Sequence, residues 1–310
     1  MPECSLIDRL SARVRRRSFR ERSPPLGSTR RRLATAIAAT PLAFVGGCDV
    51  LRLGVANPAG PVAEAQWHLL LIVGAVLFFV AAPVLILTPI IAWHYRLGKK
   101  GNVYRPTWTF SWPLEGLIWI PPTGIVVGLG FVLWHYTIAL DPYRPLPSTQ
   151  PALEVQAVAL DWKWLFIYPD QGAAAVNQMA IPVGRPVHVS LTSGTVMQSL
   201  LIPQLAGQIY AMAGMTTQLN FAANRPGTFR GQNTQFNGLG FQNQKFEVLA
   251  MPPDAFEAWV ARARATARPL DPAALDGLMQ KSVPPEPILY SSVPPDLFQT
   301  FIARTQEPSR

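Results

Sequence analysis

The chain has 310 residues, of which 49% are apolar and only 15% carry a charge, and its formal net charge is +9. Ten arginines and three acids give residues 1–47 a net charge of +7, whereas the remaining 17 basic and 15 acidic side chains total only +2. This distribution excludes a basic nucleic-acid-binding surface, and it is typical of an export leader on a chain that is poor in charge for a soluble protein.

Residues 1–47 are predicted to be a lipoprotein signal peptide. Three arginines precede an apolar stretch, residues 33–47, which is too short to span a bilayer and ends in small residues. The sequence VGGC at 45–48 resembles the lipobox of bacterial lipoproteins, which predicts that Cys48 is acylated and becomes the new N-terminus. The alternative is an unmodified cysteine after an ordinary signal peptide. Because cleavage would remove Cys4, no disulfide is expected.

Two stretches predict membrane-spanning helices, at residues 69–93 and at about 115–135. The first contains 25 residues without a charge, and the second contains an apolar run of 19 residues. Each is long enough for the roughly 20-residue helix that crosses a bilayer. Pro83 and Pro89 lie inside the first stretch, and proline is tolerated in lipid-embedded helices. The sequence therefore predicts a transmembrane hairpin at 67–140.

The basic residues predict the orientation of this hairpin. The loop between the spans, residues 94–114, contains no acid, and its basic side chains are His94, Arg96, Lys99, Lys100 and Arg105. Charges on the outer flanks nearly balance. The positive-inside rule places the loop in the cytoplasm, and it places both residues 48–66 and everything after about residue 141 in the periplasm. A lipid on Cys48 would lie on the same side, so two independent signals agree.

Beyond the hairpin the pattern becomes typical of strands. Proline-rich residues 141–152 predict a stiff linker. Short alternating segments separated by turn residues then predict a Greek-key β-sandwich or barrel at 153–252. Strands are expected at 154–160, 187–191, 218–222 and 245–249. The period changes again at 253–310, a predicted C-terminal helical extension with helices at 254–267 and 295–304. The expected fold class is thus a membrane-anchored α+β protein.

Three runs resemble subunit II of the haem-copper oxidases. DWKW at 161–164 resembles the W-x-W strand of that family, IYAMAGM at 209–215 its I-x-A-x-P-G-like turn, and NRPGTF at 224–229 the following strand. With the two spans and the lipobox, the similarity covers nearly all of 48–300. The longer runs DWKWLFIYP, SLLIPQLAGQIYAMAGM and RPGTF resemble the quinol-oxidase branch, subunit II of the cytochrome bo- or ba-type ubiquinol oxidase. The resemblance implies a cupredoxin-like fold for residues 153–252.

The stretch GQNTQFNGLGFQNQK at 231–245 resembles the loop that holds a two-copper centre in cytochrome c oxidase subunit II, but it lacks the ligands. The family pattern is C-x-E-x-C-x-x-x-H-x-x-M, with a further histidine in the strand that matches residues 196–203. The residues at these six ligand positions are Gln198, Asn233, Gln235, Asn237, Phe241 and Gln244. Copper takes thiolate and imidazole donors, so no metal is expected in this chain. Gly231, Gln232 and Gly238 remain where the loop geometry requires them.

The resemblance implies a structural and assembly subunit of a proton-pumping ubiquinol oxidase in the aerobic respiratory chain. Ubiquinol would be oxidised and O2 reduced to water in subunit I, which would carry the haems and a copper, so this chain is expected to hold no catalytic centre and no cofactor. The implied partners are subunit I, smaller membrane subunits, the lipid bilayer and, through the complex, ubiquinol. The implied location is the bacterial inner membrane, with two spans, a lipid anchor and a periplasmic domain.

Two further sites follow from the resemblance. Glu115 and Trp119 match an E-x-x-x-W-like start that resembles the mouth of a proton-uptake path into subunit I. The alternative for Glu115 is an interfacial acid that reaches water. The family's aromatic strand serves electron transfer from cytochrome c, but without copper behind them Trp162 and Trp164 are expected to fill a core or a docking face.

Two other functions compete with this interpretation. One is a true cytochrome c oxidase subunit II, which the missing ligands disfavour. The other is a non-respiratory membrane lipoprotein with a cupredoxin-like binding domain, which co-purification with a haem-containing partner would distinguish. Motifs of other enzyme classes are missing from the sequence, including G-x-S-x-G, the P-loop, C-x-x-C and H-E-x-x-H.

Overall fold

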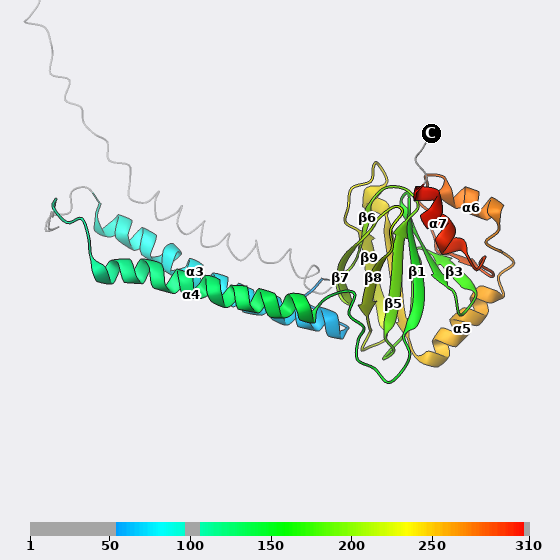
Figure 1. Ribbon diagram of the computed structural model, residues 1–310, viewed down its shortest axis with the longest axis horizontal. Helices are drawn as coiled ribbons and strands as arrows, with labels where there is room; N and C mark the ends of the chain where they lie inside the picture. The colour runs from blue at the N-terminus through cyan, green and yellow to red at the C-terminus, as the bar shows by residue number, and fades with distance from the viewer. Residues whose placement is uncertain (1–53, 97–105, 307–310) are drawn as a thin grey trace, which may run out of the picture. The chain divides into compact units, whose positions relative to one another are not determined.

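A computed structural model of the protein describes residues 54–96 and 106–306 (Figure 1). The predicted signal peptide, the lipidation site at Cys48 and three basic residues of the predicted cytoplasmic loop, Lys99, Lys100 and Arg105, lie outside the described residues.

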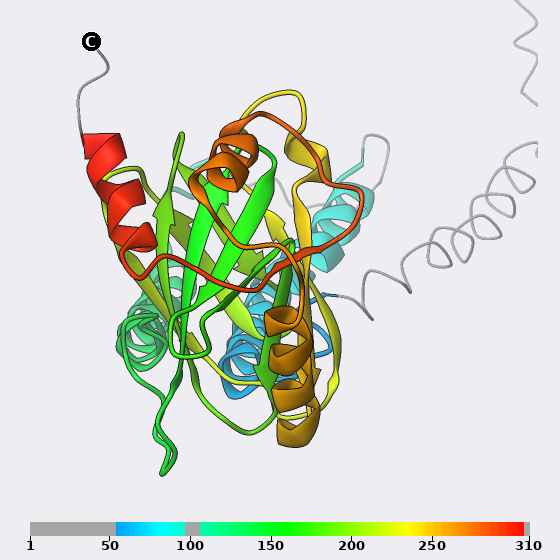
Figure 2. The ribbon, with the colours of Figure 1, turned by 90° about the vertical axis from the view of Figure 1, so that its right-hand side faces the viewer.

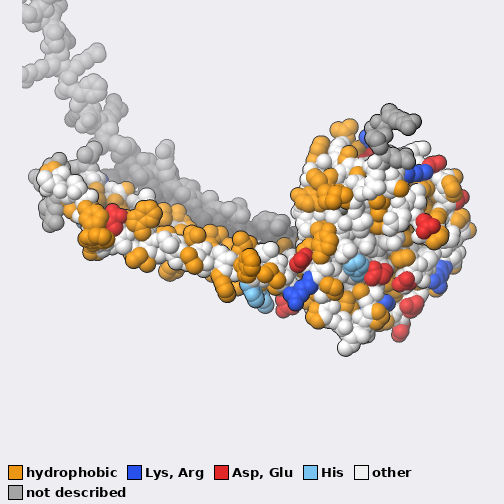
Figure 3. Space-filling model, in the orientation of Figure 1, with side chains coloured by type: hydrophobic (Ala, Val, Ile, Leu, Met, Phe, Trp, Pro, Cys, Tyr) orange, Lys and Arg blue, Asp and Glu red, His pale blue; other side chains and the backbone are white. Residues whose placement is uncertain are grey.

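The hairpin consists of two long helices, α3 (Pro61–His94) and α4 (Trp112–Ala139). Each begins with proline in its first turn, a position where the missing N–H costs no hydrogen bond. Both helices are long and apolar enough to cross a membrane. Most of their large apolar side chains are exposed, and such side chains dominate the face of the hairpin seen in Figure 3, which is typical of helices in lipid.

Helix α3 begins earlier than the apolar run, and Ala63 in its first turn is buried against the β domain. The backbone N–H of Ala59 donates to Gln204 O at 2.8 Å, and that of Asn224 donates to Ala59 O at 2.7 Å. Gly60 fits against this surface only without a side chain, since a Cβ there would lie 2.1 Å from Ala222 O. The end of the segment predicted at 48–66 is therefore helical from residue 61 onward.

Residues 153–251 form ten strands in two sheets, as the strand pattern predicts, and an eleventh strand at the edge of one sheet comes from the segment 253–310, which the sequence predicts to be helical. The six-stranded sheet has the order β11-β3-β2-β1-β5-β8, and the five-stranded sheet has the order β4-β10-β9-β6-β7. The strands of the first are β1 (Leu153–Leu160), β2 (Lys163–Tyr168), β3 (Ala173–Val176), β5 (Val187–Ser193), β8 (Thr217–Phe221) and β11 (Ile288–Tyr290). Those of the second are β4 (Gln178–Pro182), β6 (Gln198–Ile202), β7 (Ala206–Ala211), β9 (Gly227–Asn233) and β10 (Lys245–Met251).

The main core lies between the two sheets. The indole of Trp164 and the rings of Phe166 and Phe246 form its centre, with centroids 5.0–6.4 Å apart. Strand β10 alternates buried and exposed residues, since only one face of the second sheet is covered there. This arrangement confirms the predicted two-sheet fold class.

The C-terminal extension contains α5 (Pro253–Arg264), α6 (Pro272–Met279) and α7 (Leu297–Gln306). Helices α6 and α7 cover the outer face of the first sheet (Figure 2), whereas α5 packs its buried residues into the main core. Helices α5 and α7 correspond to the two predicted helices, whereas α6 is not foreseen by the sequence pattern. Leu278 and Phe301 pack with Leu165 and other residues of β1 and β2 in a second apolar cluster. Strand β2 is therefore buried on both faces, which explains the apolar run that follows Lys163.

Candidate functional site

Four of the six degenerate ligand positions meet at one end of the sandwich. Gln198 opens β6, Asn233 closes β9, Asn237 lies in the loop between β9 and β10, and Gln244 immediately precedes β10. Their carboxamide groups are joined by hydrogen bonds, and we call these four residues the amide cluster. The ligand spacing of the family motif therefore identifies four residues that lie together in this structure.

Gln244 is the centre of the amide cluster and is fully buried. Its Oε1 accepts from Asn233 Nδ2 at 3.0 Å and from Asn237 Nδ2 at 2.7 Å. Its Nε2 donates to Gln198 Oε1 and to two backbone carbonyls, Leu160 O at 3.2 Å and Lys163 O at 3.3 Å. The carboxamide of Gln244 thus has partners on both of its polar atoms, which rigidifies its surroundings, whereas Asn237 Oδ1 is buried without a hydrogen-bond partner.

Asn233 and Gln198 use the rest of their hydrogen-bonding capacity on the backbone and on a hydroxyl. Asn233 Oδ1 accepts from the N–H groups of Ser199 and Gln235, both at 3.0 Å, which fixes the start of the loop against β6. Gln198 Nε2 donates to Leu160 O and to Thr195 Oγ1, both at 3.2 Å. The amide cluster thus joins the β1–β2 turn, strand β6 and the β9–β10 loop.

The two other ligand positions do not contribute side chains to the amide cluster. Gln235 takes part through its backbone, whose carbonyl accepts from Asn233 Nδ2 at 2.8 Å. Phe241 opens a short 3-10 turn (Phe241–Asn243), and its ring packs against Phe236 with centroids 5.7 Å apart. Phe236 and Leu239, 72% and 93% exposed, make the tip of this loop apolar.

Glycines allow the loop to pack closely on aromatic rings. Gly231 lies opposite Phe246 in the β9–β10 ladder, and a Cβ on Gly231 would lie 2.1 Å from the phenyl ring. A Cβ on Gly240 would lie at the same distance from the indole of Trp162. Gly238 has φ of 109°, a left-handed backbone conformation that favours glycine.

The two tryptophans of the W-x-W run have different surroundings. Trp164 is fully buried and belongs to the core between the sheets. Trp162 is partly buried in the β1–β2 turn, with its indole over Gly240 and its Nε1 donating to Asn237 O at 3.3 Å. The first therefore fills the core as expected, and the second covers the loop of the amide cluster.

Lys163 lies between these tryptophans and is not among the site residues predicted from the sequence. Its side chain is fully buried on the opposite side of β2 from the indole of Trp164. Burial lowers the pKa of Lys163, and the nearby carboxylate of Asp161 opposes that effect. The sequence feature that could have identified Lys163 is its position beside an apolar run, because a lysine that is buried there requires hydrogen-bond partners.

The donor atoms at the six positions do not fit a copper centre. The side chains there offer amide oxygens, amide N–H groups and a phenyl ring, and they contain no thiolate or imidazole. The amide groups are moreover engaged with one another, apart from Asn237 Oδ1, and this single buried oxygen cannot replace a set of thiolate and imidazole donors. Among the described residues, no group of three or more His, Cys, Asp or Glu side chains could hold a metal ion.

Glu115 lies in the first turn of α4, on the membrane hairpin. Its Oε2 accepts a hydrogen bond from Trp119 Nε1 at 3.1 Å, one helical turn further along. The pair predicted from the E-x-x-x-W-like pattern is therefore in direct contact. Trp119 is 67% exposed, so this pair lies on an outer surface of the hairpin.

Comparison with known proteins finds a family model and several relatives that are all described as subunit II of a terminal oxidase. The family model described as "Cytochrome C oxidase subunit II, periplasmic domain" matches residues 171–248. "Cytochrome bo(3) ubiquinol oxidase subunit 2" of Pseudomonas putida is 41% identical over 267 residues, which cover 86% of this chain and 84% of that protein. The protein of the same name from Pseudomonas aeruginosa is 39% identical and covers 86% and 80%. "Ubiquinol oxidase subunit 2" of Acetobacter aceti is 39% identical and covers 84% of both chains.

Proposed function

The chain belongs to the family of ubiquinol oxidase subunit 2, and from this membership we propose that it is subunit II of a proton-pumping ubiquinol oxidase of the aerobic respiratory chain. It serves there as a structural and assembly subunit, while ubiquinol oxidation and the reduction of O2 to water take place in the haem-bearing subunit I. Smaller membrane subunits complete the complex.

The amide cluster is the observation that carries this proposal. A subunit that receives electrons from a soluble cytochrome needs a redox centre in its outer domain, and the neutral amides at the six positions provide no ligands for one. Ubiquinol is lipid-soluble and reaches the complex within the bilayer, so a relay in the outer domain is unnecessary. We therefore assign this chain no metal and no other cofactor.

The membrane arrangement forms part of the same proposal. Helices α3 and α4 span the bacterial inner membrane, with their connecting loop in the cytoplasm and the β domain in the periplasm. The excess of basic residues in the loop supports this orientation. An acyl chain on Cys48 adds a second anchor on the periplasmic side.

A purification through this chain tests its membership of the complex. The preparation is expected to contain a large haem-bearing membrane protein and to consume O2 when ubiquinol is added. A haem-free preparation would instead support a membrane lipoprotein outside the respiratory chain.

Glu115 is proposed to act at the entrance of a proton-uptake path into subunit I. Glu115→Gln removes the titratable group but keeps a carboxamide oxygen that can accept from Trp119 Nε1. We expect ubiquinol-driven O2 consumption by the purified complex to slow by about tenfold, because proton transfer through a positioned acid contributes at least that much to proton-coupled steps. Haem content and subunit composition should be unchanged.

Glu64→Gln is the matched control, since Glu64 is the acid in the first turn of the other helix. This variant should keep normal turnover. If Glu115→Gln also keeps normal turnover at normal haem content, Glu115 has no role in proton uptake.

A further inference from the structure

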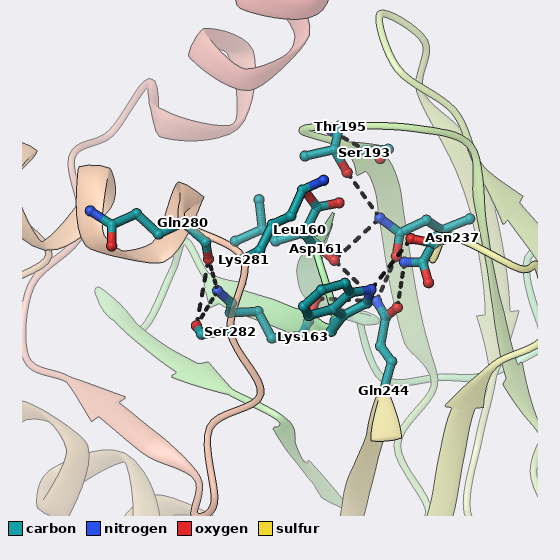
Figure 4. A network of polar contacts seen from close by, with 12 residues as sticks. Leu160, Asp161, Lys163, Ser193, Thr195, Asn237, Gln244, Gln280, Lys281 and Ser282 are labelled. Carbon is teal, nitrogen blue, oxygen red and sulfur yellow. Dashed lines mark hydrogen bonds and ion pairs between the residues drawn. The ribbon is translucent and has the colours of Figure 1, made fainter. Parts of the chain in front are cut away.

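The β1–β2 turn, residues 160–163, contacts the amide cluster on one side and the C-terminal extension on the other (Figure 4). On the inner side, Leu160 O accepts from Gln198 Nε2 and Gln244 Nε2, both at 3.2 Å. Lys163 O accepts from Gln244 Nε2 at 3.3 Å. The carbonyl groups of this turn are therefore acceptors for the amide cluster.

Trp162 adds a third inner contact from the same turn. Its φ is 68°, a left-handed conformation that is uncommon for a bulky residue and persists only where the surroundings impose it. In this conformation the indole lies over Gly240 and Nε1 reaches Asn237 O. The 160–163 turn and the β9–β10 loop therefore stabilise each other's conformation.

The outer contact is made by the Lys163 side chain. All three of its N–H donors are used at the end of α6 and just beyond it, on Leu278 O at 3.0 Å, Gln280 O at 2.6 Å and Ser282 Oγ at 2.7 Å. A cation at the C-terminal end of a helix is favoured by the helix dipole. A buried ammonium group in this position connects β2 to the extension more strongly than neutral hydrogen bonds would.

The extension also contacts a second loop at this end of the domain. The N–H of Gly214 donates to Thr305 Oγ1, and Gln306 Nε2 donates to Gly214 O, both at 2.8 Å. Phe301 of α7 fills the space beside Gly194, where a Cβ would lie 3.1 Å from its ring. The segment that follows α6 and helix α7 thus each hold a turn of the β domain in place.

We propose that the C-terminal extension braces the amide cluster through the 160–163 turn, with Lys163 as the positioning residue that transmits this support to the β9–β10 loop. Lys163 does not touch the loop with its side chain, and its influence passes through its own carbonyl, through Leu160 O and through Trp162. This role of the extension goes beyond the function proposed above and does not depend on which electron donor the complex uses.

Lys163→Met tests the proposal, because methionine keeps an unbranched apolar stem and removes the three donors. Hydrogen exchange should be measured by mass spectrometry on the full chain in detergent. Amides of residues 231–245 are expected to exchange about tenfold faster than in the unmodified chain, since local opening there would no longer be opposed by the brace. Exchange in β5 and β8, which the turn does not contact, should stay within about twofold.

Lys281→Met is the matched control, because this neighbouring lysine is 70% exposed and only approaches Asp161, at 4.0 Å. It should leave exchange of residues 231–245 unchanged. Ser282→Ala removes one of the three acceptors and provides a milder variant if Lys163→Met does not fold. Ser282→Ala should accelerate amide exchange of residues 231–245 by a smaller factor than Lys163→Met does.

Three results would overturn the proposal. Faster exchange confined to residues 268–290 would mean that the extension loosens without affecting the loop. Equal acceleration of exchange at residues 231–245 by Lys163→Met and Lys281→Met would mean that the loss of a positive charge is responsible, and not the loss of the hydrogen bonds of Lys163. Equal acceleration of all strands by Lys163→Met and Ser282→Ala would mean global destabilisation rather than a brace.

Discussion

Replacing Gln244 by leucine is expected to lower the free energy of unfolding of the β domain by about 3 kcal/mol or more. Leucine has a similar size, but it cannot replace the hydrogen bonds of the buried carboxamide. Asn237 Nδ2 and one N–H of Asn233 Nδ2, whose other N–H still donates to Gln235 O, would lose their common acceptor. Each buried donor left without a partner costs about 1–3 kcal/mol, so two such losses account for the expected effect.

The slowest-exchanging amides of β1 and β5 report this change, because they open only with the whole domain. A loss of about 3 kcal/mol should accelerate their exchange by more than about a hundredfold. Gln208→Leu is the control, since Gln208 is exposed on β7. Indistinguishable exchange in the two variants would show that the amide cluster does not stabilise the fold.

Gly231→Ala is expected to destabilise the same domain by about 2–3 kcal/mol. The added Cβ would lie 2.1, 2.3 and 2.6 Å from three atoms of the Phe246 ring. That ring cannot move away easily, because it packs against Phe166 and Trp164 with centroids 5.0 and 5.8 Å away. The same exchange measurement on β1 and β5 checks the prediction.

Gly277→Ala is a control, because it is not expected to lower the free energy of unfolding. Gly277 lies inside α6 with no other atom within 4 Å of a Cβ position. Alanine is favoured over glycine inside a helix by about 0.5–1 kcal/mol, so this variant should be neutral or stabilising. A stability loss of the same size in both variants would contradict the role assigned to close packing at Gly231.

The sequence predicts the parts of the fold that depend on local pattern or on family spacing. Apolar length predicts both helices of the hairpin, and alternation together with turn residues predicts a sandwich. The spacing of the degenerate motif identifies Gln198 and Gln244 as neighbours although 45 residues lie between them, because the family pattern carries information about distant contacts.

Other features of the fold and of the amide cluster cannot be predicted from the sequence, because they depend on contacts that leave no periodic pattern. Lys163 bonds to residues more than 110 positions away, and nothing local distinguishes its carbonyl as a partner of the amide cluster. Helix α6 spans only eight residues, too few for a clear helical period. Phe241 matches a ligand position but turns towards Phe236, because a 3-10 turn begins at that residue.

In an oxidase whose electrons come from membrane quinol, no electron needs to pass through a metal in the outer domain of this chain. The most direct test is O2 consumption by the complex purified through this chain, with ubiquinol or reduced cytochrome c as the only donor. Ubiquinol is expected to support rapid consumption and reduced cytochrome c none above background. Rapid consumption with cytochrome c, together with copper bound to this chain, would show instead that electrons enter through a metal in this subunit.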